Sequence, residues 1–72
     1  MGLQGPQDPG EGLESVVALR RMLEALEAAQ VENAFLAGWS WASIAAILGV
    51  SRQAVHKKHA GRLREKYPGL RA

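Results

Sequence analysis

The residues best able to bind a ligand lie together near the C-terminal end of the chain. Between positions 51 and 66 the sequence places six cations beside one glutamine and two histidines: Arg52, Gln53, His56, Lys57, Lys58, His59, Arg62, Arg64 and Lys66. Guanidinium, ammonium and amide groups donate hydrogen bonds, so this segment is suited to a polyanion such as nucleic acid. The alternative is a set of ordinary solvated side chains.

The charge of the chain is divided between its halves. Residues 1–38 carry a net charge of −4 and residues 39–72 a net charge of +6, although the whole chain carries only +2. A basic half joined to an acidic half predicts a polyanion-binding surface at one end of the molecule.

Other kinds of chemistry find little support in the residue pattern. His56 and His59 stand three residues apart, as a metal-binding pair would, but no cysteine or carboxylate lies beside them, so we expect no metal and no cofactor. Ser40 and Ser43 lack a paired base and an orienting acid, which predicts capping residues rather than nucleophiles. With no phosphate-cradling loop and little room for a pocket, the sequence predicts neither an enzyme nor a small-molecule substrate.

Length and composition limit the fold. Seventy-two residues fit one small domain with one modest core, for which oligomerisation is a natural way to bury more surface. The absence of cysteine favours a cytoplasmic protein, and from the residue pattern we expect neither a membrane span nor a signal peptide. Many alanines and leucines and few aromatic residues predict an all-α fold.

The first helix is expected over residues 13–37, where no Gly or Pro interrupts good helix formers. Residues 1–12, with four glycines and two prolines, are expected to form a flexible arm, although Asp8 as N-cap and Pro9 as first residue offer an earlier start. Gly38 is suited to the left-handed conformation that closes a helix.

An apolar seam runs along the N-terminal part of this helix. Val16, Leu19, Leu23 and Leu26 recur at spacings of 3, 4 and 3, and we call these four residues the leucine seam. The seam then meets the polar residues Gln30 and Asn33, while the apolar pattern moves onto Val31, Ala34 and Phe35. One helix is therefore expected to carry two differently directed apolar faces.

Two shorter helices are expected to follow. The second helix spans 41–48, with Ser40 as N-cap, Trp39 stapled onto Ile44, and a buried face made of Ile44, Ala45, Ile47 and Leu48. The third spans 52–64 within a domain of residues 13–66, with Ser51 as N-cap, Leu63 and Tyr67 docking beyond Gly61, and residues 67–72 as a tail.

The segment between these helices has the spacing of a tight turn. Ala45 is small where two helices cross, Gly49 suits positive φ, and Val55 faces back toward the second helix. Val50 is expected to plug the turn into the core. A sharp bend at residue 49 would hold two helices at a fixed angle.

The segment "AGWSWASIAAILGVSRQAVHKK" resembles bacterial helix-turn-helix domains of the type found in serine-recombinase DNA-binding domains, sigma-factor C-terminal domains and small actinobacterial regulators. The resemblance covers residues 34–60 and leaves out the long helix before it. It departs from the family pattern at Lys58, where such motifs place an apolar residue. Lys58 then either packs its aliphatic stem there, or Leu63 and a dimer partner complete that part of the core.

This resemblance implies that the third helix enters the major groove of DNA, with its N-terminal turns against the base edges. Arg52 would pair with guanine and Gln53 with adenine, while His56 and Lys57 would also reach base edges. The positions expected at phosphates are Ser40, Trp41, Ser51, Lys58, Arg62 and Arg64. Trp39 and Trp41 could instead stack on single-stranded nucleic acid, but the need of a small core for bulk explains them better.

The leucine seam finds no partner within its own chain, because a helix-turn-helix unit needs only about three turns of the first helix to cover its back. We therefore expect a homodimer through Val16, Leu19, Leu23 and Leu26. The seam could also fold back within a monomer or dock on another protein.

The function predicted is that of a sequence-specific double-stranded DNA-binding protein, a small bacterial transcriptional regulator at the nucleoid. One alternative is an adaptor that docks through the seam on a larger partner, and the other is a low-specificity nucleoid-associated protein.

Overall fold

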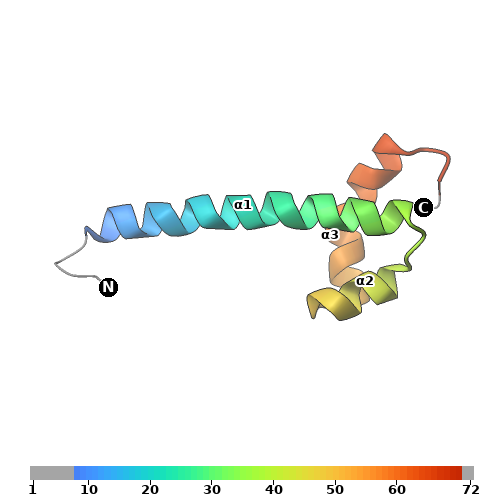
Figure 1. Cartoon of the computed structure of the whole chain (residues 1–72), viewed down its shortest axis with the longest axis horizontal. Helices are drawn as coiled ribbons and strands as arrows, with labels where there is room; N and C mark the ends of the chain where they lie inside the picture. The colour runs from blue at the N-terminus through green and yellow to red at the C-terminus, as the bar shows by residue number, and fades with distance from the viewer. Residues whose placement is uncertain (1–7, 71–72) are drawn as a thin grey trace.

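Three helices make up the part of the chain that the structure, a computed structural model, describes, residues 8–70. They are α1 (Pro9–Leu36), α2 (Trp41–Leu48) and α3 (Arg52–Lys66), and no strand occurs among the described residues. The all-α expectation is confirmed. Figure 1 shows α1 as a long rod, with α2 and α3 packed against its C-terminal half only.

The start of α1 differs from the expected position at residue 13. Asp8 is the N-cap, and its side chain accepts a hydrogen bond of 3.2 Å from the backbone N–H of Gly10, while Pro9 takes the first helical position. This local capping outweighs the low helix propensity of Gly10 and Gly12. The expected arm is therefore wrong for residues 9–12, which are helical, and its residues 1–7 lie outside the described part of the chain.

Two glycines end the first two helices. Gly38 has a φ of +88° and Gly49 a φ of +75°, which a residue without a Cβ adopts without strain. The turn at Gly38 is closed by a 3.0 Å hydrogen bond from the N–H of Trp39 to the carbonyl of Ala34, and the turn at Gly49 by a 3.1 Å hydrogen bond from Val50 to Ala45. The chain therefore bends at both positions where the sequence predicts it.

Serine side chains start the next helices. The Ser40 hydroxyl accepts a 3.0 Å hydrogen bond from the N–H of Ser43, and the Ser51 hydroxyl accepts one of 3.0 Å from the N–H of Ala54. The bounds of α2 coincide with the expected ones, whereas α3 continues through Gly61 to Lys66, two residues beyond the expected end. Tyr67 follows as the C-cap, half-buried, and residues 68–70 form a turn.

The core lies where the three helices meet. Its buried side chains are Val31 and Phe35 from α1, Trp41, Ile44 and Ala45 from α2, and Val55, His59, Ala60 and Leu63 from α3. Rings of Phe35 and Trp41 lie 5.8 Å apart, centroid to centroid. The second face expected on the first helix is thus the one that covers α2 and α3.

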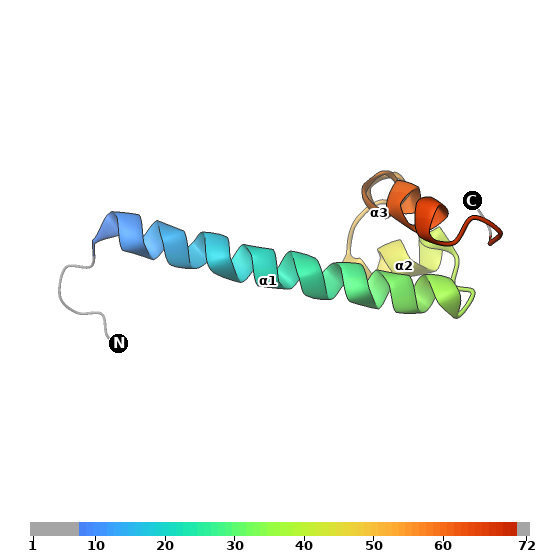
Figure 2. The same ribbon diagram turned by 90° about the horizontal axis from the view of Figure 1, so that it is seen from above.

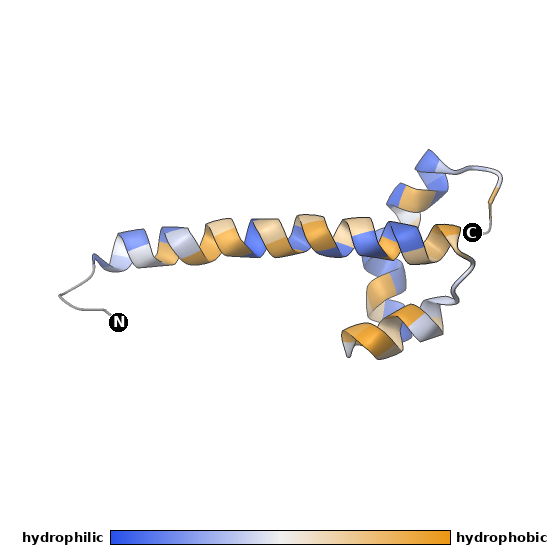
Figure 3. Ribbon diagram, viewed as in Figure 1, coloured by the Kyte–Doolittle hydropathy of each residue, from blue (hydrophilic) through white to orange (hydrophobic). Residues whose placement is uncertain are grey.

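Three apolar residues expected in the core are exposed. Ile47 is 75% exposed, Leu48 40% and Val50 48%, so the buried face of α2 is limited to Trp41, Ile44 and Ala45. Ile47 and Leu48 line an open groove between α1 and α2, which leaves them exposed. Figure 3 shows the resulting apolar end of α2, in orange, and the apolar residues that recur along α1.

No helix within residues 8–70 is both long enough and apolar enough to cross a membrane. Along α1, every residue from Asp8 to Leu26 is exposed. Figure 2, the view from above, shows this half of the helix extending away from α2 and α3.

Candidate nucleic-acid interface

The turn at Gly49 sets the direction in which α3 leaves the body. Val55 is only 2% exposed and Leu63 is fully buried, so both residues face the core. Their burial fixes the rotation of α3 about its helix axis. Side chains two positions from Val55 point about 200° away from it around a helix of 3.6 residues per turn. Lys57 therefore points outward, and its side chain is exposed.

Four polar side chains remain exposed on the outer side of α3. Gln53, Lys57 and Arg64 follow one another at spacings of four and seven, which places them on one helix face, and Arg52 is exposed in the first turn. We call these four residues the outward face of α3. Among the described residues, none of its three cations forms an ion pair.

The cations on the other side of α3 are bound by carboxylates of α1. Lys58 Nζ lies 2.7 Å from Glu24 Oε1 and 3.2 Å from Glu27 Oε2, and Lys66 Nζ lies 2.9 Å from Glu32 Oε2. The hydrogen bond to Glu24 raises the pKa of Lys58, and the hydrogen bond to Glu32 raises the pKa of Lys66. Lys58, expected at a phosphate, is paired with carboxylates of α1 in this structure, and its contact with a phosphate stays a prediction.

His59 is the side chain that ties α3 to α1. It is 2% exposed, and its Nε2 lies 2.8 Å from Glu27 Oε2, while Arg62 Nη2 lies 3.1 Å from its Nδ1. A neutral ring with its hydrogen on Nε2 donates to Glu27 and accepts from Arg62, so one tautomer satisfies both contacts. Arg62, expected at a phosphate, is exposed and contacts the histidine through one guanidinium nitrogen.

The burial of His59 was not expected from the sequence, which indicated a place in the basic segment or in a metal pair. The missed signal is its spacing, since it stands four residues after Val55 and four before Leu63, both of which face the core. No group of three or more potential metal ligands occurs among the described residues.

Two of the three glutamates of α1 that contact α3 have lowered pKa values. The hydrogen bond from His59, followed by that from Lys58, lowers the pKa of Glu27, and the hydrogen bond from the Tyr67 hydroxyl lowers the pKa of Glu32. The same contact with Glu32 raises the pKa of Tyr67. These contacts hold the end of α3 against α1.

His56 and Trp41 pack against each other at the edge of the core. Trp41 is 5% exposed and stacks in the core, so its expected place at a phosphate is wrong. His56 is half-buried and makes an edge-to-face contact with Trp41 at a centroid distance of 5.4 Å. Packing thus restrains the His56 ring at the rim of the outward face.

Ser40 and Ser51 are exposed, and both use their hydroxyl groups as N-caps. At each helix start, further backbone N–H groups of the first turn point outward, as the N-terminus of any α-helix requires. Both residues keep the exposure that a contact with a phosphate needs.

Comparison of the chain with models of known protein families, with curated proteins and with solved structures found no match. What the outward face of α3 can bind is therefore inferred from its own polar groups. It presents two guanidinium forks, one ammonium and one amide, none of them bound by a carboxylate among residues 8–70. Such groups can donate hydrogen bonds to phosphates and to base edges.

Proposed function

We propose that the chain is a helix-turn-helix protein that binds double-stranded DNA with sequence specificity, with α3 in the major groove. The observation that carries this proposal is the division of the cations on α3. Lys58 and Lys66 pair with carboxylates of α1 and Arg62 contacts His59, whereas Arg52, Lys57 and Arg64 form no ion pair among the described residues. Lys57 and Arg64 share one helix face with Gln53, and Arg52 is exposed in the first turn of α3, so these cations are available to a polyanion.

The roles of these residues follow from their side chains. Arg52 donates a bidentate pair to guanine and Gln53 pairs with adenine, because both lie in the first turn of α3, which approaches the base edges. Lys57 and Arg64 contribute contacts to the phosphates, and His56 contacts the DNA from the rim of the face. The protein acts as a small bacterial transcriptional regulator at the nucleoid, as a homodimer that pairs through the leucine seam.

Selection of bound duplexes from a random pool tests this proposal, followed by fluorescence anisotropy on the selected duplex at several salt concentrations. We expect a selected consensus and an affinity that falls steeply with salt. Arg52→Ala is expected to lose about 1–3 kcal/mol on the selected duplex and to relax the sequence preference. Lys57→Ala is expected to weaken binding to all duplexes and to reduce the salt slope by about 1.

Arg21→Ala is the matched control, because Arg21 is an exposed cation on the bare half of α1, far along the chain from α3. It is expected to leave duplex affinity unchanged. Equal binding to every duplex would replace the proposal with a nucleoid-coating function. Absence of duplex binding at low salt would refute it and favour an adaptor.

A further inference from the structure

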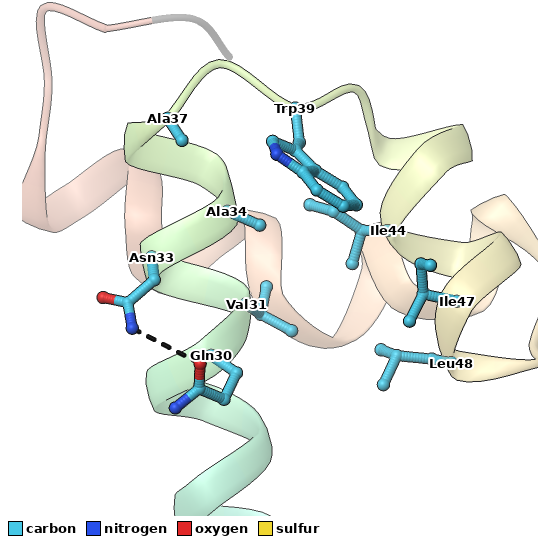
Figure 4. Close-up of a pocket in the computed structure, with 9 residues that line it drawn as sticks. All are labelled: Gln30, Val31, Asn33, Ala34, Ala37, Trp39, Ile44, Ile47 and Leu48. Atoms are coloured by element: carbon cyan, nitrogen blue, oxygen red, sulfur yellow. Dashed lines mark hydrogen bonds between the residues drawn. The ribbon is translucent and has the colours of Figure 1, made fainter.

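The leucine seam continues into a groove between α1 and α2. From Val16 to Ala37, the seam and its continuation follow alternate spacings of three and four: Val16, Leu19, Leu23, Leu26, Gln30, Asn33 and Ala37. The last three of these line an open groove of about 400 Å³, which is closed on the other side by Trp39, Ile44, Ile47 and Leu48 (Figure 4). Residues at this heptad spacing lie on one helix face, so the seam and the groove form one continuous surface.

The two halves of this surface differ in a way that makes them complementary. The N-terminal half of α1 is bare, with every residue exposed up to Leu26, whereas the C-terminal half is flanked by α2. The groove of one copy can therefore accept the N-terminal half of the partner's α1. It cannot accept the C-terminal half, because the partner's own α2 would occupy the same space. Two copies satisfy this condition only when their α1 helices run in opposite directions.

We infer that two copies of this chain pair through antiparallel α1 helices, with the N-terminal turns of each α1 seated against Ile47 and Leu48 in the groove of the other. This inference rests on the homodimer proposed above, and it does not depend on DNA binding. The occupant of the groove is thus a second copy of the chain.

The apolar pattern selects the register of this pair. When the two-fold axis passes residue 21, Val16 packs against the partner's Leu26, and Leu19 against the partner's Leu23. All four seam residues of each copy then meet apolar residues. A shift by one heptad would instead bury Leu19 against the partner's Gln30 and Val16 against the partner's Asn33. The polar side chains would then be buried without hydrogen-bond partners, which is unfavourable in free energy.

The same register places the partner's Leu13 opposite residue 29, next to Gln30 at the end of the groove that Ile47 and Leu48 also line. Leu13 lies three residues before Val16, on the flank of α1 that faces α2 further along the helix. Its side chain is 67% exposed within one chain. Gln30 and Asn33 would face the partner's Gly12 and Pro9 at the end of the interface, where they keep access to water.

The surface area that a stable dimer must bury indicates that the groove belongs to the interface. Full burial of a large apolar side chain removes roughly 60–120 Å² from water, and the side chains concerned are about half exposed, so each contributes about 50 Å². The four seam residues supply roughly 200 Å² per partner, too little for a stable dimer, which buries about 800 Å² per partner. Adding Leu13, Trp39, Ile47 and Leu48 gives roughly 400 Å² of apolar surface, which corresponds to about 600 Å² per partner, at the low end for a specific interface, because a homodimer interface is about 65% apolar.

Arg20 of each copy lies near the two-fold axis in this arrangement, and the two like charges repel each other. Both side chains are exposed, so salt screens this repulsion. It therefore opposes pairing only weakly.

Chemical cross-linking tests the arrangement directly, because the chain has no cysteine and each introduced thiol is unique. We expect the double variant Leu13→Cys/Ile47→Cys to give a covalent dimer with a short bis-maleimide. Each single variant is expected to stay monomeric on a denaturing gel, since the two copies of residue 13 would be about 24 Å apart along the helices. Ala18→Cys/Ile47→Cys is the matched control, because position 18 lies on the α1 face away from the seam, and it should give no covalent dimer.

Light scattering of the uncross-linked protein completes the test. The wild type and Ala18→Asp/Ala25→Asp are expected to have the mass of a dimer, and Leu19→Asp/Leu23→Asp the mass of a monomer with unchanged α2 and α3. Cross-linking of Leu13→Cys alone would show a parallel pair and overturn the inference. A dimer in which the double variant does not cross-link would overturn the register, and a monomeric wild type would overturn the homodimer and leave this surface to a different protein. None of these outcomes bears on duplex binding, which is measured separately.

Discussion

At the scale of single residues, polar contacts hold α3 against α1. Glu27 accepts a hydrogen bond from the buried His59 and also lies 3.2 Å from Lys58 Nζ, while Glu24 contacts only Lys58 and is about half exposed. A buried donor that loses its acceptor pays the full cost of its desolvation, whereas an exposed ion pair gains little. Of the two glutamates, Glu27 should therefore matter more to stability.

We expect Glu27→Ala to lower the free energy of unfolding by about 1–3 kcal/mol, because it leaves the N–H of His59 buried without an acceptor. Glu24→Ala, which removes only the exposed contact, is expected to cost less than about 1 kcal/mol. Urea unfolding followed by circular dichroism at 222 nm measures both. Equal losses for the two variants would mean that the histidine contact contributes nothing beyond the ion pair.

At the scale of elements, the turn between α2 and α3 depends on the backbone of Gly49. No atom lies within 4 Å of a Cβ added there, so the cost of a side chain is conformational and comes from the φ of +75°. Gly61 has equally open space but lies inside α3. The two glycines thus test the turn and the helix separately.

We expect Gly49→Ala to destabilise the protein by about 1–2 kcal/mol, since L-residues are strained in the left-handed conformation. Gly61→Ala is expected to stabilise it by about 0.5–1 kcal/mol, because alanine is the better helix former. Thermal unfolding of the two variants beside the wild type checks the opposite signs. A destabilising Gly61→Ala would mean that α3 does not continue through residue 61.

At the scale of the whole molecule, the acidic and basic halves of the chain meet along the contact between α1 and α3. The pKa values of Glu27 and Glu32 are lowered there, and those of Lys58, Lys66 and Tyr67 are raised. A carboxyl group with a lowered pKa stabilises the folded state above its ordinary pKa of 4.5 and loses this effect as the pH falls through the lowered value. The raised pKa of Tyr67 acts in the opposite direction, and its effect is lost as the pH rises above 10.0.

We therefore expect the midpoint of thermal unfolding to fall progressively as the pH is lowered below 4.5. Tyr67→Phe keeps the ring that lies 6.3 Å from Phe35 but removes the hydroxyl that donates to Glu32. This variant is expected to show a smaller loss on acidification than the wild type. A midpoint that does not change with acid would mean that neither carboxyl group is tied to α3 in solution.

The sequence alone determined where the helices begin and end to within a few residues. Ser40 and Ser51 as caps, with Gly38 and Gly49 at the turns, act through hydrogen bonds and backbone angles that span only a few neighbouring residues. The start at Pro9 differs from the expected one because the Asp8 cap and the proline outweigh the low helix propensity of two glycines. For the candidate site, the sequence predicted that Arg52, Gln53 and Lys57 are exposed.

Only the tertiary structure decided which cations remain free and which apolar residues remain uncovered. Lys58 and Lys57 are adjacent in the sequence, yet Lys58 meets Glu24 and Glu27, more than thirty positions away, while Lys57 faces outward. Ile44 and Ile47 share one short helix, but α1 covers only the first. These outcomes depend on how α3 and α2 are placed against α1, and contacts between residues far apart in the chain set that placement.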